Sequence, residues 1–311
     1  MNAIPRHLRI ATRESRLALR QTGMVAAALR ARHAALEVEI VGMTTRGDQV
    51  LDRPLAEVGG KGLFVKELET ALDEDRADIA VHSLKDVPML IPGQFALATF
   101  GAREDPRDAF VSNRYASPAS MPAGAVVGTS SVRRECQLRG IYPALAFRAL
   151  RGNVITRLAK LDAGDYDAII LAVAGLKRLD LAARVRATLD ETIPAIGQGI
   201  LAVEYRRERG DVAALLADFE DAATACAARA ERALGLVVEG SCEVPVGALA
   251  HVNSDSVTLE GFIGMPDGTR FVRERVSGRC GDAESLGAAL GESLLAAGGR
   301  EILGSLAGVS A

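Results

Sequence analysis

Tryptophan is absent from this chain of 311 residues, and aromatic residues make up only 4% of it. Proteins that bind single-stranded nucleic acid do so largely by stacking bases on aromatic side chains, so this composition argues against that kind of binding. The formal net charge is -3, so no general positive field attracts nucleic acid or an acidic membrane surface. Any affinity for anions must therefore come from local clusters of basic residues.

Cysteine is also scarce, and it occurs only as Cys136, Cys226, Cys242 and Cys280. These residues form no C-x-x-C pair and no histidine stands at a zinc-ligand spacing from them, so we expect neither a structural metal nor disulfides. The longest apolar run, 168–176, is too short for a membrane span, and charges throughout residues 1–20 argue against a secretory signal. Together these absences predict a reduced protein of the cytoplasm without a membrane partner.

What the chain does contain is the alternation of strands and helices typical of an α/β protein. Its length predicts two or three domains at ~100–200 residues each. Residues 8–11 and 36–41 have strand patterns on either side of an amphipathic helix at 16–32. A second strand at 125–128 repeats this opening, because threonine and arginine follow both first strands at the same spacing. This weak internal similarity predicts two α/β lobes that face each other across a cleft.

The remaining patterns complete the lobes and add a smaller domain. Residues 194–199 are interpreted as a hinge, 200–205 as a strand that returns to the first lobe, and 213–234 as one Ala-rich helix. Further elements of the lobes are expected at 63–76, 95–100, 145–150 and 166–173. Three antiparallel strands and two helices of a C-terminal α+β domain are expected at 246–252, 257–263, 270–276, 282–297 and 300–306.

The stretch 78–88 places polar groups where a strand should end. It opens with a short apolar run, and Ser83, Lys85 and Asp86 follow. In open α/β sheets, ligands bind beyond the carboxyl ends of the strands. Asp86 could stay ionised there and stabilise a developing positive charge. The alternative is an ordinary surface ion pair between Lys85 and Asp86, and this stretch alone does not decide between the two.

Arginines also gather at expected strand ends and first helical turns. They are Arg13, Arg16, Arg133, Arg134, Arg151, Arg157 and Arg178. Arginine binds carboxylates and phosphates through paired hydrogen bonds, and helix N-termini favour anions, so this pattern indicates a polyanionic ligand in the cleft. For the first of these turns, helix capping by Thr12 or Ser15 is the alternative. The long connection 43–62 is expected to be a mobile lid, with Lys61 facing the site.

Cys242 stands in a tight loop, between a Gly-Ser pair and a Val-Pro pair, rather than in a helix. A loop cysteine near cationic side chains is a candidate nucleophile, because such surroundings lower its pKa. A cysteine packed as a small apolar residue is the alternative, and it is our interpretation for Cys136, Cys226 and Cys280.

Glu231, Arg232 and Leu234, followed by the loop 240–247, resemble the cofactor-attachment signature of the porphobilinogen deaminases, also called hydroxymethylbilane synthases. The resemblance covers nearly the whole chain. Its other motifs, in chain order, are 11–15, 59–64, 82–88, 128–134, 151–154, 171–178 and 198–199. These motifs are long and stand in the expected order.

The resemblance implies three domains, 1–101 with 200–219, 102–199 and 220–311, of which the first two are similar to the lobes of periplasmic binding proteins. It implies a dipyrromethane cofactor bound to Cys242 through a thioether. It also implies an enzyme that joins four porphobilinogen molecules head to tail, with loss of ammonia, to give hydroxymethylbilane. Asp86 is then the catalytic carboxylate. The implied substrate- and cofactor-binding residues are Arg13, Ser15, Lys61, Ser83, Lys85, Thr129, Ser131, Arg133, Arg134, Arg151, Gly152, Arg157, Arg178 and Gln198. No metal is implied, and a monomer in the cytoplasm is expected.

Two rival functions stay open on the sequence. A two-lobed cytoplasmic binding protein for a small polycarboxylate also explains the lobes and the arginines, but it leaves Asp86 and Cys242 without a task. A nucleic-acid-binding protein conflicts with the net charge and the few aromatic residues. The mass of the intact protein separates the enzyme from the binding protein, because only the enzyme carries a covalent cofactor. Elution from a heparin column tests for the nucleic-acid-binding protein.

Overall fold

The computed structural model describes residues 4–45, 47, 60–238 and 244–307. Within it the chain forms two compact units, Met1–Glu104 with Ile200–Ala225, and Asp105–Gly199 with Cys226–Ala311. Most of the predicted lid at 43–62, the side chain of Lys61 and the whole of Cys242 lie outside the described residues.

The first unit is built on a five-stranded sheet in the order β2-β1-β3-β10-β4. Its strands are β1 (His7–Arg13), β2 (Glu37–Met43), β3 (Ile79–Ser83), β4 (Phe95–Thr99) and β10 (Leu201–Arg206). β1 is parallel to β2 and β3, whereas β10 runs antiparallel between β3 and β4. The expected strand at 200–205 that returns to the first lobe is therefore confirmed.

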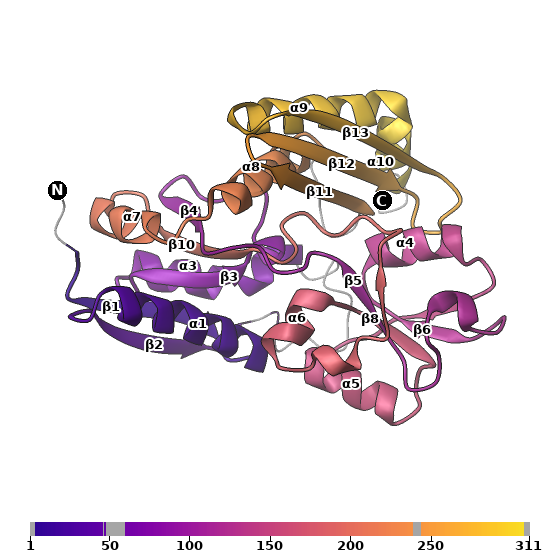
Figure 1. Cartoon of the computed structure of the whole chain (residues 1–311), viewed down its shortest axis with the longest axis horizontal. Coiled ribbons are helices and arrows are strands. Elements are labelled where there is room, and N and C mark those ends of the chain that lie inside the picture. The colour runs from indigo at the N-terminus through magenta and orange to yellow at the C-terminus, as the bar shows by residue number, and fades with distance from the viewer. Residues whose placement is uncertain (1–3, 46, 48–59, 239–243, 308–311) are drawn as a thin grey trace. The chain divides into compact units, whose positions relative to one another are not determined.

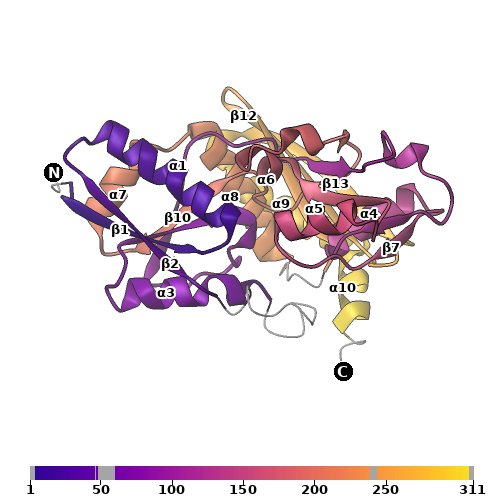
Figure 2. The same ribbon diagram turned by 90° about the horizontal axis from the view of Figure 1, so that it is seen from below.

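Helices cover both faces of this sheet. They are α1 (Arg16–Arg32), α3 (Lys66–Asp73) and α7 (Gly210–Ala217), with single turns η2 (Gly60–Phe64) and η3 (Leu84–Asp86). Figure 2 shows α1 and α3 on opposite sides of β1 and β2. Because side chains alternate along a strand, Leu8 and Ile10 of β1 pack with α1 while Ala11 packs with α3.

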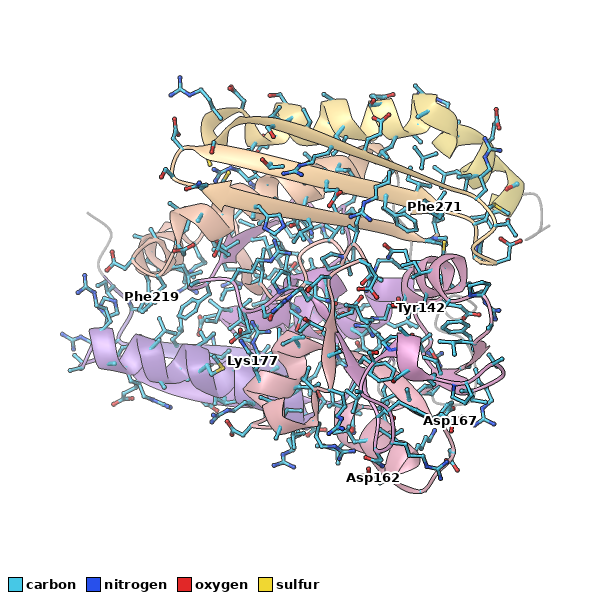
Figure 3. The ribbon with its side chains drawn as sticks, turned by 45° about the vertical axis from the view of Figure 1, so that its right-hand side comes forward. Tyr142, Asp162, Asp167, Lys177, Phe219 and Phe271 are labelled. Carbon is cyan, nitrogen blue, oxygen red and sulfur yellow. The ribbon has the colours of Figure 1, made fainter. Side chains whose placement is uncertain are left out.

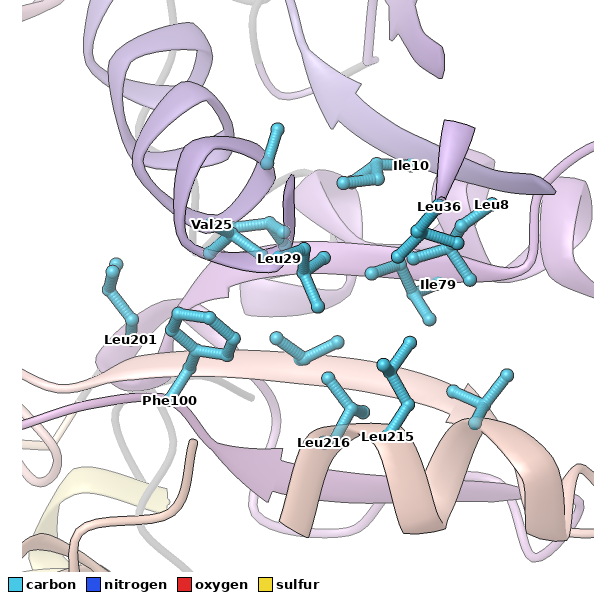
Figure 4. Close-up of a cluster of buried hydrophobic side chains, with 14 residues drawn as sticks. Leu8, Ile10, Val25, Leu29, Leu36, Ile79, Phe100, Leu201, Leu215 and Leu216 are labelled. Carbon is cyan, nitrogen blue, oxygen red and sulfur yellow. The ribbon is translucent and has the colours of Figure 1, made fainter. Parts of the chain in front are cut away.

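The core on the α1 side is the larger of these two clusters in the described part of the unit. Val25 and Leu29 of α1 and Leu215 of α7 pack against the strand residues there (Figure 4). Each fully buried Leu or Ile of such a cluster contributes about 1.5–3 kcal/mol to the stability of the fold. This packing fixes α1, and with it the turn that joins β1 to α1.

The second unit contains a second five-stranded sheet, in the order β7-β6-β8-β5-β9. Its strands are β5 (Asp108–Val111), β6 (Val126–Gly128), β7 (Ala146–Arg148), β8 (Ala168–Ala172) and β9 (Ala187–Leu189). Its helices are α4 (Val132–Ile141), α5 (Val154–Asp162) and α6 (Val173–Arg178), with turns η4 (Pro118–Ser120) and η5 (Ala182–Arg184). As in the first sheet, three parallel strands are followed by antiparallel pairs.

A three-stranded antiparallel sheet, β11-β12-β13, forms the end of the chain. Its elements are α8 (Ala222–Val237), β11 (Val246–Asn253), β12 (Ser256–Gly264), β13 (Phe271–Arg279), η6 (Cys280–Asp282), α9 (Ala283–Leu294), the π-turn η7 (Leu295–Gly299) and α10 (Arg300–Ala307). α9 lies along β12 and β13 (Figure 1). Gly287 lets α9 approach α8 closely, because a Cβ there would stand 2.1 Å from the carbonyl oxygen of Ala230. The expected fold class, two α/β lobes and a smaller C-terminal α+β part, is confirmed.

One expectation about a single element is wrong, and a second element is shorter than expected. The helix expected at 213–234 is broken into α7 and α8 at residues 218–221, where Phe219 (Figure 3) turns inward and stacks on Phe100 with ring centroids 4.9 Å apart. The element expected at 145–150, whose type the sequence left open, is the shorter strand β7, Ala146–Arg148.

Candidate active site

A pocket in the first unit lies at the carboxyl ends of β1 and β3 and at the N-terminus of α1. It holds about 380 Å³ of empty space, part of it open to solvent. Its lining residues are Arg13, Ser15, Leu17, Ala18, Gln21, Phe64, Val65, Val81, His82, Ser83 and Asp86. Four of the residues predicted from the sequence, Arg13, Ser15, Ser83 and Asp86, are therefore brought together.

The turn after β1 places positively charged and hydrogen-bond-donating groups at one side of the pocket. Ser15 caps α1, since its hydroxyl accepts a hydrogen bond from the Ala18 amide at 3.3 Å, whereas the Thr12 hydroxyl is buried and bonds with Thr22. The capping alternative is thus correct for Ser15, which lines the pocket as well. Arg13 stacks over the ring of Phe64, 4.2 Å from its centroid. The free amides at the start of α1 and the Arg13 guanidinium both favour an anion.

The turn after β3 supplies the carboxylate. Ser83 is the last residue of β3, and its hydroxyl accepts a hydrogen bond from Gln21 of α1 at 2.8 Å. The next turn, η3, carries Asp86, which is half-buried. Lys85 is also half-buried but does not line the pocket. A carboxylate beside a guanidinium and a helix N-terminus can bind a ligand that has both an acidic and a cationic end.

His82, which lines the pocket, has a buried acidic neighbour that the sequence did not indicate. Nε2 of His82 lies 3.0 Å from a carboxylate oxygen of Glu204 in β10, and the side chains are only 4% and 0% exposed. Burial and the negative charge of Glu204 raise the pKa of the nearby Glu69, in α3, to about 7. An acidic residue in the middle of the apolar strand 201–206 was the available signal for this group.

In the second unit, Arg133 and Arg134 share one carboxylate. They lie 2.7 and 2.8 Å from the two oxygens of Asp108, and Gln198 donates a further hydrogen bond to it at 2.9 Å. Arg133 also donates to the carbonyl of Ile193, and Arg134 to that of Ile170. Arg133, Arg134 and Gln198 were expected from the sequence, but their common partner Asp108 was not.

Arg133, Arg134 and Asp108 together carry a net positive charge. Burial would raise the pKa of Asp108, but the positive charges of Arg133 and Arg134 outweigh burial and hold that pKa far below its ordinary value. Burial lowers the pKa of Arg133, and the charge of Arg134 lowers it further although Asp108 opposes both. Asp108 is therefore a carboxylate, and two guanidinium groups face one negative charge.

The other expected residues of the second unit lie at helix starts and strand ends. Ser131 caps α4 by accepting a hydrogen bond from the Arg134 amide, and the hydroxyl of Thr129 accepts one from the Ser131 amide. Arg157 donates to the carbonyl of Gly152 at 2.7 Å.

Lys160 and Arg178 of the second unit also donate hydrogen bonds to backbone carbonyls. Lys160 donates to the carbonyl of Arg151, so α5 holds the turn at 151–152 in place. Arg178, at the end of α6, donates to the carbonyl of Gly199 at 2.7 Å.

Glu231 explains part of the motif that precedes Cys242. It is fully buried in α8, and its carboxylate accepts hydrogen bonds from the amides of Gly197, at 2.7 Å, and of Ala250, at 2.8 Å. One side chain thus joins the turn that carries Gln198 to the strand β11. The motif residue Glu231 is therefore structural support for neighbouring segments.

A family model described as "Porphobilinogen deaminase, dipyromethane cofactor binding domain" matches residues 8–214, and one described as "Porphobilinogen deaminase, C-terminal domain" matches residues 225–296. The chain belongs to the porphobilinogen deaminase family. The porphobilinogen deaminase of Burkholderia thailandensis is 57% identical over 313 residues, which cover 99% of this chain and 95% of that protein. That of Thiobacillus denitrificans is 55% identical over 301 residues, which cover 96% and 98%.

Among solved structures, the methionine-binding protein MetQ has a TM-score of 0.46 at 13% identity, and the similarity covers 73% of this chain and 95% of that chain. The family expected from the sequence is confirmed, and with it an enzyme of the transferase class with a dipyrromethane cofactor rather than a polycarboxylate-binding protein. The attachment of this cofactor to Cys242 stays a prediction. No helix within the described residues combines the length and the apolar character that a membrane crossing needs.

Proposed function

We propose that this porphobilinogen deaminase family member joins four molecules of porphobilinogen head to tail, loses ammonia at each step and releases hydroxymethylbilane. The observation that carries the proposal is Asp86, which shares one pocket with Arg13 and the N-terminus of α1 in a chain matched by both family models. The Asp86 carboxylate stabilises the positive charge that develops as ammonia leaves and as the new carbon–carbon bond forms.

The neighbours of Asp86 bind and orient the substrate. Arg13 pairs with a substrate carboxylate, and its stacking on Phe64 limits the directions in which the guanidinium can point. Because the Ser83 oxygen already accepts a hydrogen bond from Gln21, its own hydrogen is free to be donated to the substrate.

The described residues suit a cofactor rich in carboxylates. Two buried guanidinium groups share the single carboxylate of Asp108, and Nε of Arg133 has no hydrogen-bond partner among the described atoms. When bound, the dipyrromethane supplies the primer to which the pyrrole units are added. We propose that its carboxylates and those of the substrate are bound by Arg13, Ser15, Lys61, Ser83, Lys85, Thr129, Ser131, Arg133, Arg134, Arg151, Gly152, Arg157, Arg178 and Gln198. Cys242 is the proposed point of attachment.

The mass of the intact protein tests this proposal. The purified chain should be heavier than its sequence by two linked pyrrole units, and Cys242→Ser should lose both this mass and the turnover of porphobilinogen. Cys136→Ser is the control, because Cys136 is buried and burial raises the pKa of its thiol to about 12. An adduct that persists in Cys242→Ser, or that maps to another cysteine, would contradict the assignment.

The proposal extends to a monomer in the cytoplasm, with porphobilinogen as the partner and neither nucleic acid nor membrane. The small net charge of -3 supports the part of the proposal that excludes nucleic acid and membrane, because it provides no general attraction to either. Light scattering on the eluting protein, with and without porphobilinogen, should give the mass of one chain. A dimer mass in either condition would contradict the monomer.

A further inference from the structure

Asp108 begins β5 and is buried completely between the two arginines that bind it. Its side chain is 0% exposed, and those of Arg133 and Arg134 are 6% and 8% exposed. The guanidinium of Arg134 is held by Asp108 and by the carbonyl of Ile170, and that of Arg133 by Asp108 and the carbonyl of Ile193. In this arrangement neither arginine presents an open surface to a ligand.

The proposed function nevertheless assigns ligand carboxylates to these two arginines. Nε of Arg133 has no hydrogen-bond partner among the described atoms, but both side chains are enclosed, at 6% and 8% exposed. A ligand carboxylate therefore reaches the planar fork of either guanidinium only where an existing partner moves away. Ile170 lies in the middle of β8, where it pairs with Phe110, and the amide of Ile193 donates a hydrogen bond to Gln137, so the backbone at both carbonyls is fixed. Asp108 is the partner with the same chemistry as the ligand, because both are carboxylates.

We propose that Asp108 is an internal counter-anion that occupies Arg133 and Arg134 until a ligand carboxylate replaces it on at least one of them. This inference rests on the proposed function, since it takes the two arginines to be ligand-binding residues. Two positive charges on one negative charge leave room for a second carboxylate without an excess of negative charge. The exchange also lets Asp108 exclude ligands that cannot compete with a buried ion pair.

The first unit offers a matched control. Asp78 is likewise a buried carboxylate between two arginines, 3.1 Å from Arg9 and 2.8 Å from Arg209, with 8% of its side chain exposed. None of these three residues lines the pocket that contains Asp86. Replacing Asp78 therefore removes a similar ion pair without touching a residue proposed to bind ligand.

The test uses the full-length chain with Cys242→Ser, which cannot attach the cofactor, and porphobilinogen as the probe. Asp108→Asn and Asp78→Asn are each added to this parent, and calorimetric titration and the thermal midpoint are measured with and without porphobilinogen. Both variants should unfold at a lower temperature than the parent without ligand. Only Asp108→Asn should bind porphobilinogen more tightly, by about tenfold, since it removes a charge-assisted competitor.

Two results would overturn the inference. Unchanged affinity in Asp108→Asn, as in Asp78→Asn, would show that Asp108 is an ion-pair partner with no part in binding. Weaker affinity would show that Asp108 holds the arginines in place instead of competing with the ligand. If the parent itself binds no porphobilinogen, then the proposed role of the arginines fails and the exchange fails with it.

A second measurement needs no substitution at Asp108 and so does not depend on the folding of a variant. In the parent chain labelled with ¹³C in the aspartate carboxyl groups, the Asp108 resonance should shift when porphobilinogen is added, while that of Asp78 should not. A stationary Asp108 resonance at saturating porphobilinogen would exclude the exchange.

Discussion

At the scale of single residues, the proposed chemistry depends most on Asp86. If Asp86 only helped to bind substrate, Asp86→Asn would raise KM and leave kcat unchanged, because the amide keeps the shape and one acceptor oxygen. We expect instead that kcat falls by about a hundredfold or more, since a neutral amide cannot stabilise a developing cation. The measurement is steady-state turnover of porphobilinogen by cofactor-loaded protein.

Asp86→Glu is the matched control for this substitution, because it keeps the charge and displaces it by one methylene. It should retain part of the turnover. Circular dichroism should show both variants folded. Near-normal kcat in Asp86→Asn would mean that another group carries the chemistry, and Asp86 would then be an ordinary neighbour of Lys85.

Glu69 gives the first unit a pH-dependent stability. Its pKa is about 7 in the folded chain against an ordinary value of 4.5, so folding favours its protonated form. The unfolding free energy should therefore fall as pH rises from about 4.5 to 7 and should fall no further from this group above pH 7. Glu69→Gln should remove this loss and stabilise the protein by about 1 kcal/mol at pH 8, a figure reduced for the partial exposure of Glu69.

Urea unfolding at pH 5 and pH 8 checks this expectation. Glu74→Gln is the control, since Glu74 follows the same helix, is exposed and pairs with Arg76 at the surface. Equal effects of the two substitutions at pH 8 would exclude a special role for Glu69.

The sequence indicated the polar residues that end β1 and β3 because their chemistry is local: a strand stops and its last side chains meet solvent or ligand. It did not indicate Asp108, whose arginine partners are 25 and 26 positions away on another element. Such a contact depends on which strand neighbours which helix. The sequence shows that arginines are concentrated at strand ends and first helical turns, but it does not show which acidic residue forms ion pairs with them.

At the scale of elements, the break between α7 and α8 is explained by contacts of residues in the break itself, which the Ala-rich pattern of the sequence did not indicate. The carboxylate of Asp221 accepts hydrogen bonds from the amide and the hydroxyl of Thr224, at 2.8 and 2.7 Å, and so starts α8. Phe219, two residues before Asp221, lies between the two helices and stacks on Phe100. The Ala-rich helical pattern of residues 213–234 continues through the break and does not indicate either contact.

Asp221→Ala should lower the unfolding free energy by about 1 kcal/mol at pH 7, the usual cost of losing an N-cap. The hydrogen bonds from Thr224 hold the pKa of Asp221 below its ordinary value of 3.8, so the cap is complete above that pH and is lost as acid protonates the carboxylate. The difference from the parent should therefore shrink as the pH falls below 3.8. Glu220→Ala, at an exposed neighbouring position, should change the unfolding free energy by less than about 0.5 kcal/mol.

At the scale of the whole molecule, the first unit is assembled from two separate parts of the chain. β10 comes from beyond residue 199, yet it lies between β3 and β4 and pairs with both. The sequence anticipated this return, because a strand pattern follows the glycine-rich hinge at 194–199. It could not show where in the sheet the strand inserts, since the pairing partners are set by the other strands.

This topology predicts how truncated chains behave. A fragment that ends at residue 199 lacks β10 and leaves facing edges of β3 and β4 unpaired. It also lacks α7, whose Leu215 and Leu216 fill the α1-side core. We expect this fragment to show no slow amide exchange in β3, whereas a fragment that ends at residue 225 contains the whole first unit and should protect β3 as the full chain does. Hydrogen exchange followed by mass spectrometry measures both fragments. Equal protection of β3 in the shorter fragment would mean that β1, β2 and β3 fold without β10, and the first unit would then be stabilised mainly by its N-terminal segment.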